Sequence, residues 1–163
     1  QDINACVVKN GHKKLKWKKG EMPAIGAYMA YTSRGKKQNV VIPNNKAALA
    51  AYNRGKVNFY AKRGQLNFAC ADCHVYNSGM MARGNLLSPA LGHTSHFPVW
   101  RRKWAKGKGG TAGFGTIQRR YGGCNKQVRA KPLKAQSAEY NALEYFHTFM
   151  SNGIKLNGPA IRQ

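Results

Sequence analysis

Two cysteines and a histidine stand at a spacing that supports covalent haem chemistry. Cys70 and Cys73 enclose two residues, and His74 follows directly. At this spacing both thiols add to the vinyl groups of haem while the adjacent imidazole binds its iron. A reducible disulfide and half of a zinc site are the alternatives, but neither Cys6 nor Cys124 has the neighbouring ligand that a zinc site needs. The motif therefore predicts one covalently bound haem c, with thioethers at Cys70 and Cys73 and with His74 as the proximal iron ligand.

The ligand on the opposite side of the iron separates an electron carrier from a catalyst. Carriers usually place methionine or histidine there. Met80 and Met81 follow His74 too closely to reach the far face of the haem, so we interpret them as packing residues. His93 and His96 are better spaced along the chain, and each is either a ligand or an ordinary loop histidine.

Cys124 offers a third kind of distal ligand. It follows two glycines, which permit close backbone approach, and Arg119 and Arg120 lie just before them. Fixed positive charge lowers the pKa of a thiol and favours the thiolate, the form that binds iron and attacks sulfur. The residues alone leave two interpretations of Cys124: a distal iron ligand, or the partner of Cys6 in a structural disulfide.

The chain is strongly basic. Its 28 lysines and arginines face five acidic residues, which gives a formal net charge of +23. Such a field concentrates small anions and acidic partners. We do not predict nucleic-acid binding, because no base-reading motif accompanies the charge. The basic segment 101–108 is either a solvated face or a docking surface for an acidic partner.

The location is predicted from the haem motif and from the start of the chain. No apolar run of 18 or more residues occurs, so we expect no membrane-spanning helix. The chain begins at Gln1 without an initiator Met or an apolar leader, which we interpret as a mature form after removal of a signal peptide. Since covalent haem attachment requires export, we expect the periplasm, a compartment that permits disulfides.

The composition of the chain changes near residue 43. Residues 1–43 hold basic clusters punctuated by glycine and proline, which predicts a basic, mostly irregular N-terminal arm. Within it, residues 26–32 are predicted as a short strand or helix. Residues 44–163 are predicted to form the haem domain. There, residues 77–123 are rich in Gly, Ser and Pro, which favours a long haem-wrapping loop region with one or two short helices.

Two helices are predicted to position the motif. An apolar stripe of helical period spans residues 45–64, with Asn44 or Asn45 able to cap its start, and Ser137 caps an aromatic terminal helix of about four turns. A helix before the motif, a loop-rich middle and an aromatic terminal helix resemble the layout of a class I cytochrome c domain. The resemblance implies an all-α fold in which the first and last helices cross, with Gly55 and Phe59 at the positions where that family has a glycine and an aromatic residue.

A more specific resemblance covers roughly residues 45–162. Several separate segments, in the right order, resemble the C-terminal haem domain of the sulfur-oxidation cytochrome SoxA. They are Gly64–Asn67 before the haem motif, Arg119–Pro132 around the third cysteine, Ser137–Glu144 in the terminal helix and the ending Gly158–Arg162.

This resemblance implies an L-cysteine S-thiosulfotransferase. In that family SoxA pairs with the smaller cytochrome SoxX, and the complex joins thiosulfate oxidatively to a cysteine of the carrier protein SoxYZ. The family's catalytic cysteine, which is also the distal iron ligand, corresponds to Cys124, and its catalytic arginine corresponds to Arg120. Thiosulfate would be held by Arg120, with Arg119 or Arg129 assisting through bidentate contacts.

The chain also departs from many members of that family. They carry a fuller N-terminal domain with a second haem or a disulfide, whereas the segment before Cys70 is short here and holds a single cysteine. We interpret the chain as a shortened, single-haem type. Cys6 is then left over, which predicts an intermolecular disulfide or an exposed thiol.

Two other classes of function stay open at this point. One is a simple electron-transfer cytochrome with histidine or methionine as distal ligand and a basic docking face. The other is a structural subunit in which Cys6 crosslinks chains and the haem does not react with sulfur compounds.

Overall fold

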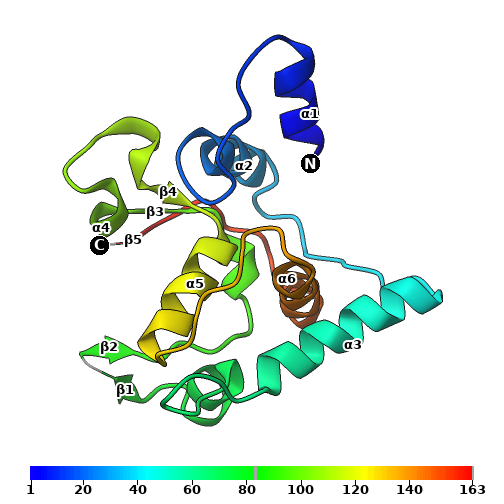
Figure 1. The fold of residues 1–163 in the computed structure, drawn as a ribbon, viewed down its shortest axis with the longest axis vertical. Coiled ribbons are helices and arrows are strands. Elements are labelled where there is room, and N and C mark those ends of the chain that lie inside the picture. Colours follow the sequence, from blue (N-terminus) through cyan, green and yellow to red (C-terminus); the bar gives the residue numbers. More distant parts are fainter. Residues whose placement is uncertain (83, 163) are drawn as a thin grey trace.

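Figure 1 shows the computed structural model, which describes residues 1–82 and 84–162. Within these residues, six α-helices and five short strands are joined by a π-helical turn at Asp72–Tyr76 and two 3₁₀ turns at His93–His96 and Gly110–Gly113. The helices are α1 Asp2–Lys9, α2 Glu21–Thr32, α3 Lys46–Tyr60, α4 Arg102–Ala105, α5 Ile117–Gln127 and α6 Ala138–Met150; the strands are β1 Met81–Ala82, β2 Asn85–Leu86, β3 Val99–Arg101, β4 Phe114–Gly115 and β5 Ala160–Arg162.

Helices α3 and α6 cross in close contact, as the cytochrome layout predicted (Figure 1). Gly55 allows this approach, because a Cβ there would collide with the carbonyl oxygen of Ala142 and with Phe146. Phe59, one turn further along α3, is almost completely buried against Phe146, with ring centroids 5.6 Å apart. The crossing therefore anchors the core just before the chain reaches the Cys70–His74 motif.

The predicted caps of these two helices are confirmed. Asn45 accepts a hydrogen bond from the backbone N–H of Ala48, and Ser137 accepts one from Tyr140. Each cap satisfies a donor that the first turn of a helix leaves without a partner. Helix α3 ends at Tyr60, earlier than predicted, and a turn at Arg63–Phe68 follows before the haem motif.

The prediction of an all-α fold is confirmed only in part. The fold is mainly helical, but β3 pairs antiparallel with β4 and parallel with β5, and β1 and β2 form a second, two-stranded sheet. Strand β5 lies about sixty residues after β3 in the chain. A pairing of two- and three-residue strands over that separation leaves no periodic signal in the sequence.

The N-terminal arm is more helical than predicted. Residues 26–32 belong to α2, and α1 precedes it. The buried side chain of Asn4 explains part of this order, because its amide donates to the carbonyl of Leu15 and accepts from the N–H of the same residue. The arm also packs on the sheet, through a bridge between Lys19 and Gly115. Among the described residues, no helix is both long enough and apolar enough to cross a membrane.

Candidate haem and thiol site

One short helical segment presents all three residues of the haem motif. The side chain of Asp72 accepts a hydrogen bond from the backbone N–H of Ala69 at 2.7 Å and so closes the first turn. Cys70 and His74 lie four residues apart on this segment, and Cys73 lies between them. All three are half-buried. A continuous helical backbone therefore fixes the two thiols and the imidazole relative to one another.

His74 is oriented by its backbone neighbours. Its Nδ1 donates to the carbonyl oxygen of Ser88 at 2.7 Å, and its own carbonyl accepts from the N–H of Ala90 at 2.8 Å. Burial lowers the pKa of His74, and the positive charge of Arg120 lowers it further. A neutral imidazole with Nδ1 engaged leaves Nε2 as the ligating nitrogen, which is the arrangement expected of a metal-binding histidine.

Helix α5 brings Cys124 to the motif. Thr116 caps the helix, and its apolar side, which includes Ile117 and Tyr121, is buried. Cys124 is half-buried and lies close enough to Cys70 and Cys73 that its charge contributes to raising the pKa of both thiols. Burial is the larger cause in each case, and it helps to raise the pKa of Cys70 to about 11. The structure thus gathers the three cysteines that the sequence assigned to one site.

The disulfide alternative is not found. Cys6 is exposed on α1, and none of the four cysteines forms a disulfide. Within the described chain, no group of three or more His, Cys, Asp or Glu side chains is placed to hold a metal ion. The geometry therefore does not favour a zinc site, and it leaves Cys124 available as a thiol ligand.

The two neighbouring arginines of α5 lie next to different parts of the structure. Arg120 lies close enough to His74 to lower its pKa. Arg119 instead stacks on Trp104, with its guanidinium carbon 4.2 Å from the ring centroid, and donates to the carbonyl oxygen of Phe114. Its expected assistance to Arg120 is therefore not supported by this geometry. Arg129 lies beyond the end of the helix and is exposed.

The other ligand candidates occupy unsuitable positions. Met80 and Met81 are 61% and 64% exposed, so neither is held in a buried site. His93 contacts His74 edge to face with ring centroids 4.8 Å apart, and its Nε2 lies 2.7 Å from the hydroxyl of Ser88. Because the carbonyl oxygen of Ser88 accepts from Nδ1 of His74, His93 lies near the Nδ1 side of that imidazole.

No family model matches this chain, but curated proteins and a solved structure are similar to it. SoxA subunits of L-cysteine S-thiosulfotransferase from Chlorobaculum thiosulfatiphilum and Allochromatium vinosum are 52% and 49% identical to it, each over 99% of the chain. The crystal structure of SoxXA from P. pantotrophus matches with a TM-score of 0.85 and 32% identity over 99% of the chain. Over almost its whole length, the chain is similar to SoxA subunits. It spans 54% and 55% of the two curated SoxA subunits and 58% of the solved chain.

Two residues beside this site were not predicted to take part in it. The charge of Arg63 lowers the pKa of Cys70, against the larger effect of burial. Gly64, with a φ of +70°, closes the same turn directly against the carbonyl of Val128 at the end of α5. Both lie in the turn before the motif. Gly64 was named only within the segment Gly64–Asn67 that resembles SoxA, and no local pattern marks Arg63.

A third missed residue is His147 of α6. It is buried, and its Nδ1 lies 2.9 Å from the hydroxyl of Tyr121 while its Nε2 lies 2.9 Å from the carbonyl oxygen of Ala90. Burial lowers its pKa to about 4. In the sequence, His147 is simply a polar residue next to aromatic ones in the terminal helix. Nothing there indicates its two partners, which lie on separate elements.

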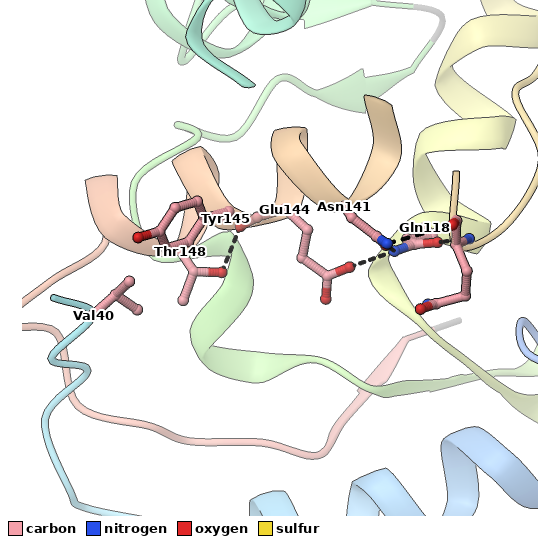
Figure 2. Close-up of a pocket in the computed structure, with 7 residues that line it drawn as sticks. Val40, Gln118, Asn141, Glu144, Tyr145 and Thr148 are labelled. Carbon is pink, nitrogen blue, oxygen red and sulfur yellow. Dashed lines mark hydrogen bonds between the residues drawn. The ribbon is translucent and has the colours of Figure 1, made fainter. Parts of the chain in front are cut away.

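One surface cavity lies away from the cysteines. Figure 2 shows this cavity of about 380 Å³ along α6, where Glu144 accepts a hydrogen bond from Gln118 at 2.8 Å and Gln118 also donates to Asn141. Burial raises the pKa of Glu144. These side chains link α5 to α6, and none of the cysteines lines the cavity. We therefore assign it a structural role.

Proposed function

We propose that this chain is the haem-bearing part of a SoxA-type L-cysteine S-thiosulfotransferase, with Cys124 as the covalent site for thiosulfate. The observation that carries the proposal is the position of Cys124 on α5, a half-buried thiol beside Cys70 and Cys73, with Arg120 near His74. Homology to SoxA subunits over 99% of the chain supports the same assignment.

The residues of the motif fit a single haem c. Cys70 and Cys73 would form the thioethers, His74 would bind the iron through Nε2, and Cys124 would supply the distal thiolate. When bound, the haem supplies one-electron redox chemistry at the site. Arg63 and Arg120 add positive charge around the thiols and the imidazole.

Arg120 is proposed to bind the substrate. Thiosulfate is a small dianion, and a guanidinium can hold an oxyanion through two parallel hydrogen bonds. The net charge of +23 concentrates such anions near the protein. Arg119 is engaged with Trp104, so we assign the contact to Arg120 alone.

Cys124 is proposed to form the covalent bond. Joining its thiolate to the sulfane sulfur of thiosulfate forms one S–S bond and releases two electrons, and a c-type cytochrome relay is the class of oxidant that accepts them. A thiolate on a carrier protein then attacks the sulfane sulfur, which breaks its bond to Cys124 and regenerates the Cys124 thiolate. A SoxX-like cytochrome and a SoxYZ-like carrier are the proposed partners, and the periplasm is the proposed compartment.

The mass of the peptide that contains Cys124 tests this function. The oxidised, haem-loaded protein is exposed to thiosulfate, digested without reductant and compared with an untreated sample. We expect an addition of thiosulfate or of sulfur on the Cys124 peptide and none on the Cys6 peptide, which serves as the exposed control thiol. An unmodified Cys124 peptide, or equal modification of both cysteines, would contradict the assignment.

A further inference from the structure

One line of buried hydrogen bonds joins the three elements that carry the proposed site. The hydroxyl of Tyr121 on α5 lies 2.9 Å from Nδ1 of His147 on α6. Nε2 of His147 lies 2.9 Å from the carbonyl oxygen of Ala90, and the N–H of Ala90 donates to the carbonyl of His74 at 2.8 Å. The line thus runs without a break from the helix of Cys124 to the backbone of the proximal histidine.

The direction of each bond in this line is fixed. A carbonyl oxygen only accepts, so Nε2 of His147 carries the proton toward Ala90, and Nδ1 is left to accept from the hydroxyl of Tyr121. His147 is 4% exposed and Tyr121 is 8% exposed. Burial lowers the pKa of His147 and raises that of Tyr121, so both side chains are neutral near pH 7. Each bond therefore has one donor and one acceptor, and the pair is fully satisfied.

The loop that contains Ala90 also orients the imidazole of His74. Ser88, two residues before Ala90, accepts from Nδ1 of His74, and its hydroxyl contacts His93. Tyr121 lies one residue after Arg120 and three before Cys124, on a continuous helix. A shift of Tyr121 relative to Ala90 would therefore move Cys124 relative to His74.

We propose that Tyr121 and His147 are positioning residues that hold α5 at a fixed distance from the His74 segment and so keep the sulfur of Cys124 within reach of the iron opposite His74. The inference rests on the proposed function, in which Cys124 and His74 are the two axial ligands. Neither Tyr121 nor His147 is assigned contact with substrate.

The test compares ferric haem spectra of the haem-loaded protein and three variants: Tyr121→Phe, His147→Gln and the double variant. The ratio of thiolate-ligated to thiolate-free haem is read from the low-spin thiolate signature. We expect each single variant to lower this ratio by about tenfold, which corresponds to roughly 1.4 kcal/mol, about the weight of one hydrogen bond. The double variant should lower it by no more than the larger single effect, because both substitutions break the same link.

Gln118→Ala is the matched control. Gln118 also joins α5 to α6 through buried polar contacts, but its partners are Asn141, Glu144 and Gln136, and none of them leads to Ala90. We expect it to lower the melting temperature and to leave the thiolate ratio within about twofold of the parent protein.

The outcomes separate the two proposals. A ratio of thiolate-ligated to thiolate-free haem that is unchanged in both single variants would overturn the positioning role and leave the proposed function standing. An equal fall of this ratio in Gln118→Ala would also overturn the positioning role. The absence of a thiolate signature in the unsubstituted protein would overturn the proposed function itself. If one single variant fails to fold, the other still decides, because each breaks the link at a different residue.

Discussion

Two sides of helix α5 use similar side chains for different ends. On one side, Arg120 and Cys124 lie four residues apart. The charge of Arg120 lowers the pKa of His74, and that of Cys124 contributes to raising the pKa of Cys70. On another, Arg119 stacks on Trp104 and closes the end of β4 through Phe114. Successive residues of an α-helix are rotated by about 100°, so two adjacent arginines point in different directions. Arg119 and Arg120, which are neighbours in sequence, therefore lie on a structural side of the helix and on its proposed reactive side.

The sharpest contrast is expected between two cysteines. Cys124→Ala should reduce the coupling of thiosulfate to a carrier cysteine to background, because the proposed covalent site is removed. Covalent haem should be retained, since Cys70 and Cys73 are unchanged. Cys6→Ala, on the exposed α1, should keep the parent rate. Coupling is measured by the mass of the carrier, and haem attachment by haem-stained gels; equal activity of the two variants would remove the distinction.

The two arginines should separate by kinetics. Arg120→Ala is expected to lower kcat/KM for thiosulfate by roughly 10- to 100-fold, the effect of one or two charge-assisted hydrogen bonds. Arg119→Ala should stay within about twofold and instead lower the free energy of unfolding by about 0.5–1 kcal/mol, through loss of the contact with Trp104. Steady-state rates and denaturant titrations check both. The comparison fails if Arg119→Ala is the slower enzyme.

A third side of α5 carries Tyr121, whose partner His147 should contribute to the pH dependence of the free energy of unfolding. The pKa of His147 is about 4 in the folded state against 6.5 for the free side chain, so the unfolded chain binds this proton first as the pH falls. Folded-state stability is therefore lost between about pH 6.5 and pH 4, by up to about 3 kcal/mol from this residue. His147→Gln should flatten that part of the curve. His12→Gln, in the exposed arm, should leave it unchanged; a steep curve in both variants would contradict the assignment.

The smallest effect is expected at the cap of the helix itself. Thr116→Ala removes the side-chain acceptor for the N–H of Arg119 and should cost about 1 kcal/mol of folding free energy. Both sides of α5 depend on the same helix, so thiosulfate turnover per folded molecule should not change. Thermal unfolding and turnover measured together test this. A loss of turnover without a loss of stability would show that Thr116 belongs to the reactive side.

Local patterns were sufficient for the elements that carry the crossing of α3 and α6. Asn45 and Ser137 begin their helices as capping rules require, and Gly55 stands where a side chain would collide with the partner helix. The motif and the resemblance also named the residues that the structure gathers, with Cys124 beside Cys70 and Cys73. The caps, the glycine at the crossing and the haem motif depend on residue type and spacing alone, whereas Cys124 was assigned to the site through the resemblance.

Features that depend on distant contacts could not be predicted. Strand β5 exists only because it pairs with β3, far back in the chain. The order of the arm depends on the amide of Asn4 reaching Leu15. His147 gains its role from partners on two other elements, Tyr121 and Ala90. Their positions follow from tertiary packing, which no local spacing encodes.

Iron-edge X-ray absorption of the ferric, haem-loaded protein tests the central claim most directly, because it identifies the atoms bound to the metal. The account predicts one axial sulfur together with the imidazole of His74, and the loss of that sulfur in Cys124→Ala. Nitrogen at both axial positions, or a sulfur that persists in Cys124→Ala, would contradict it.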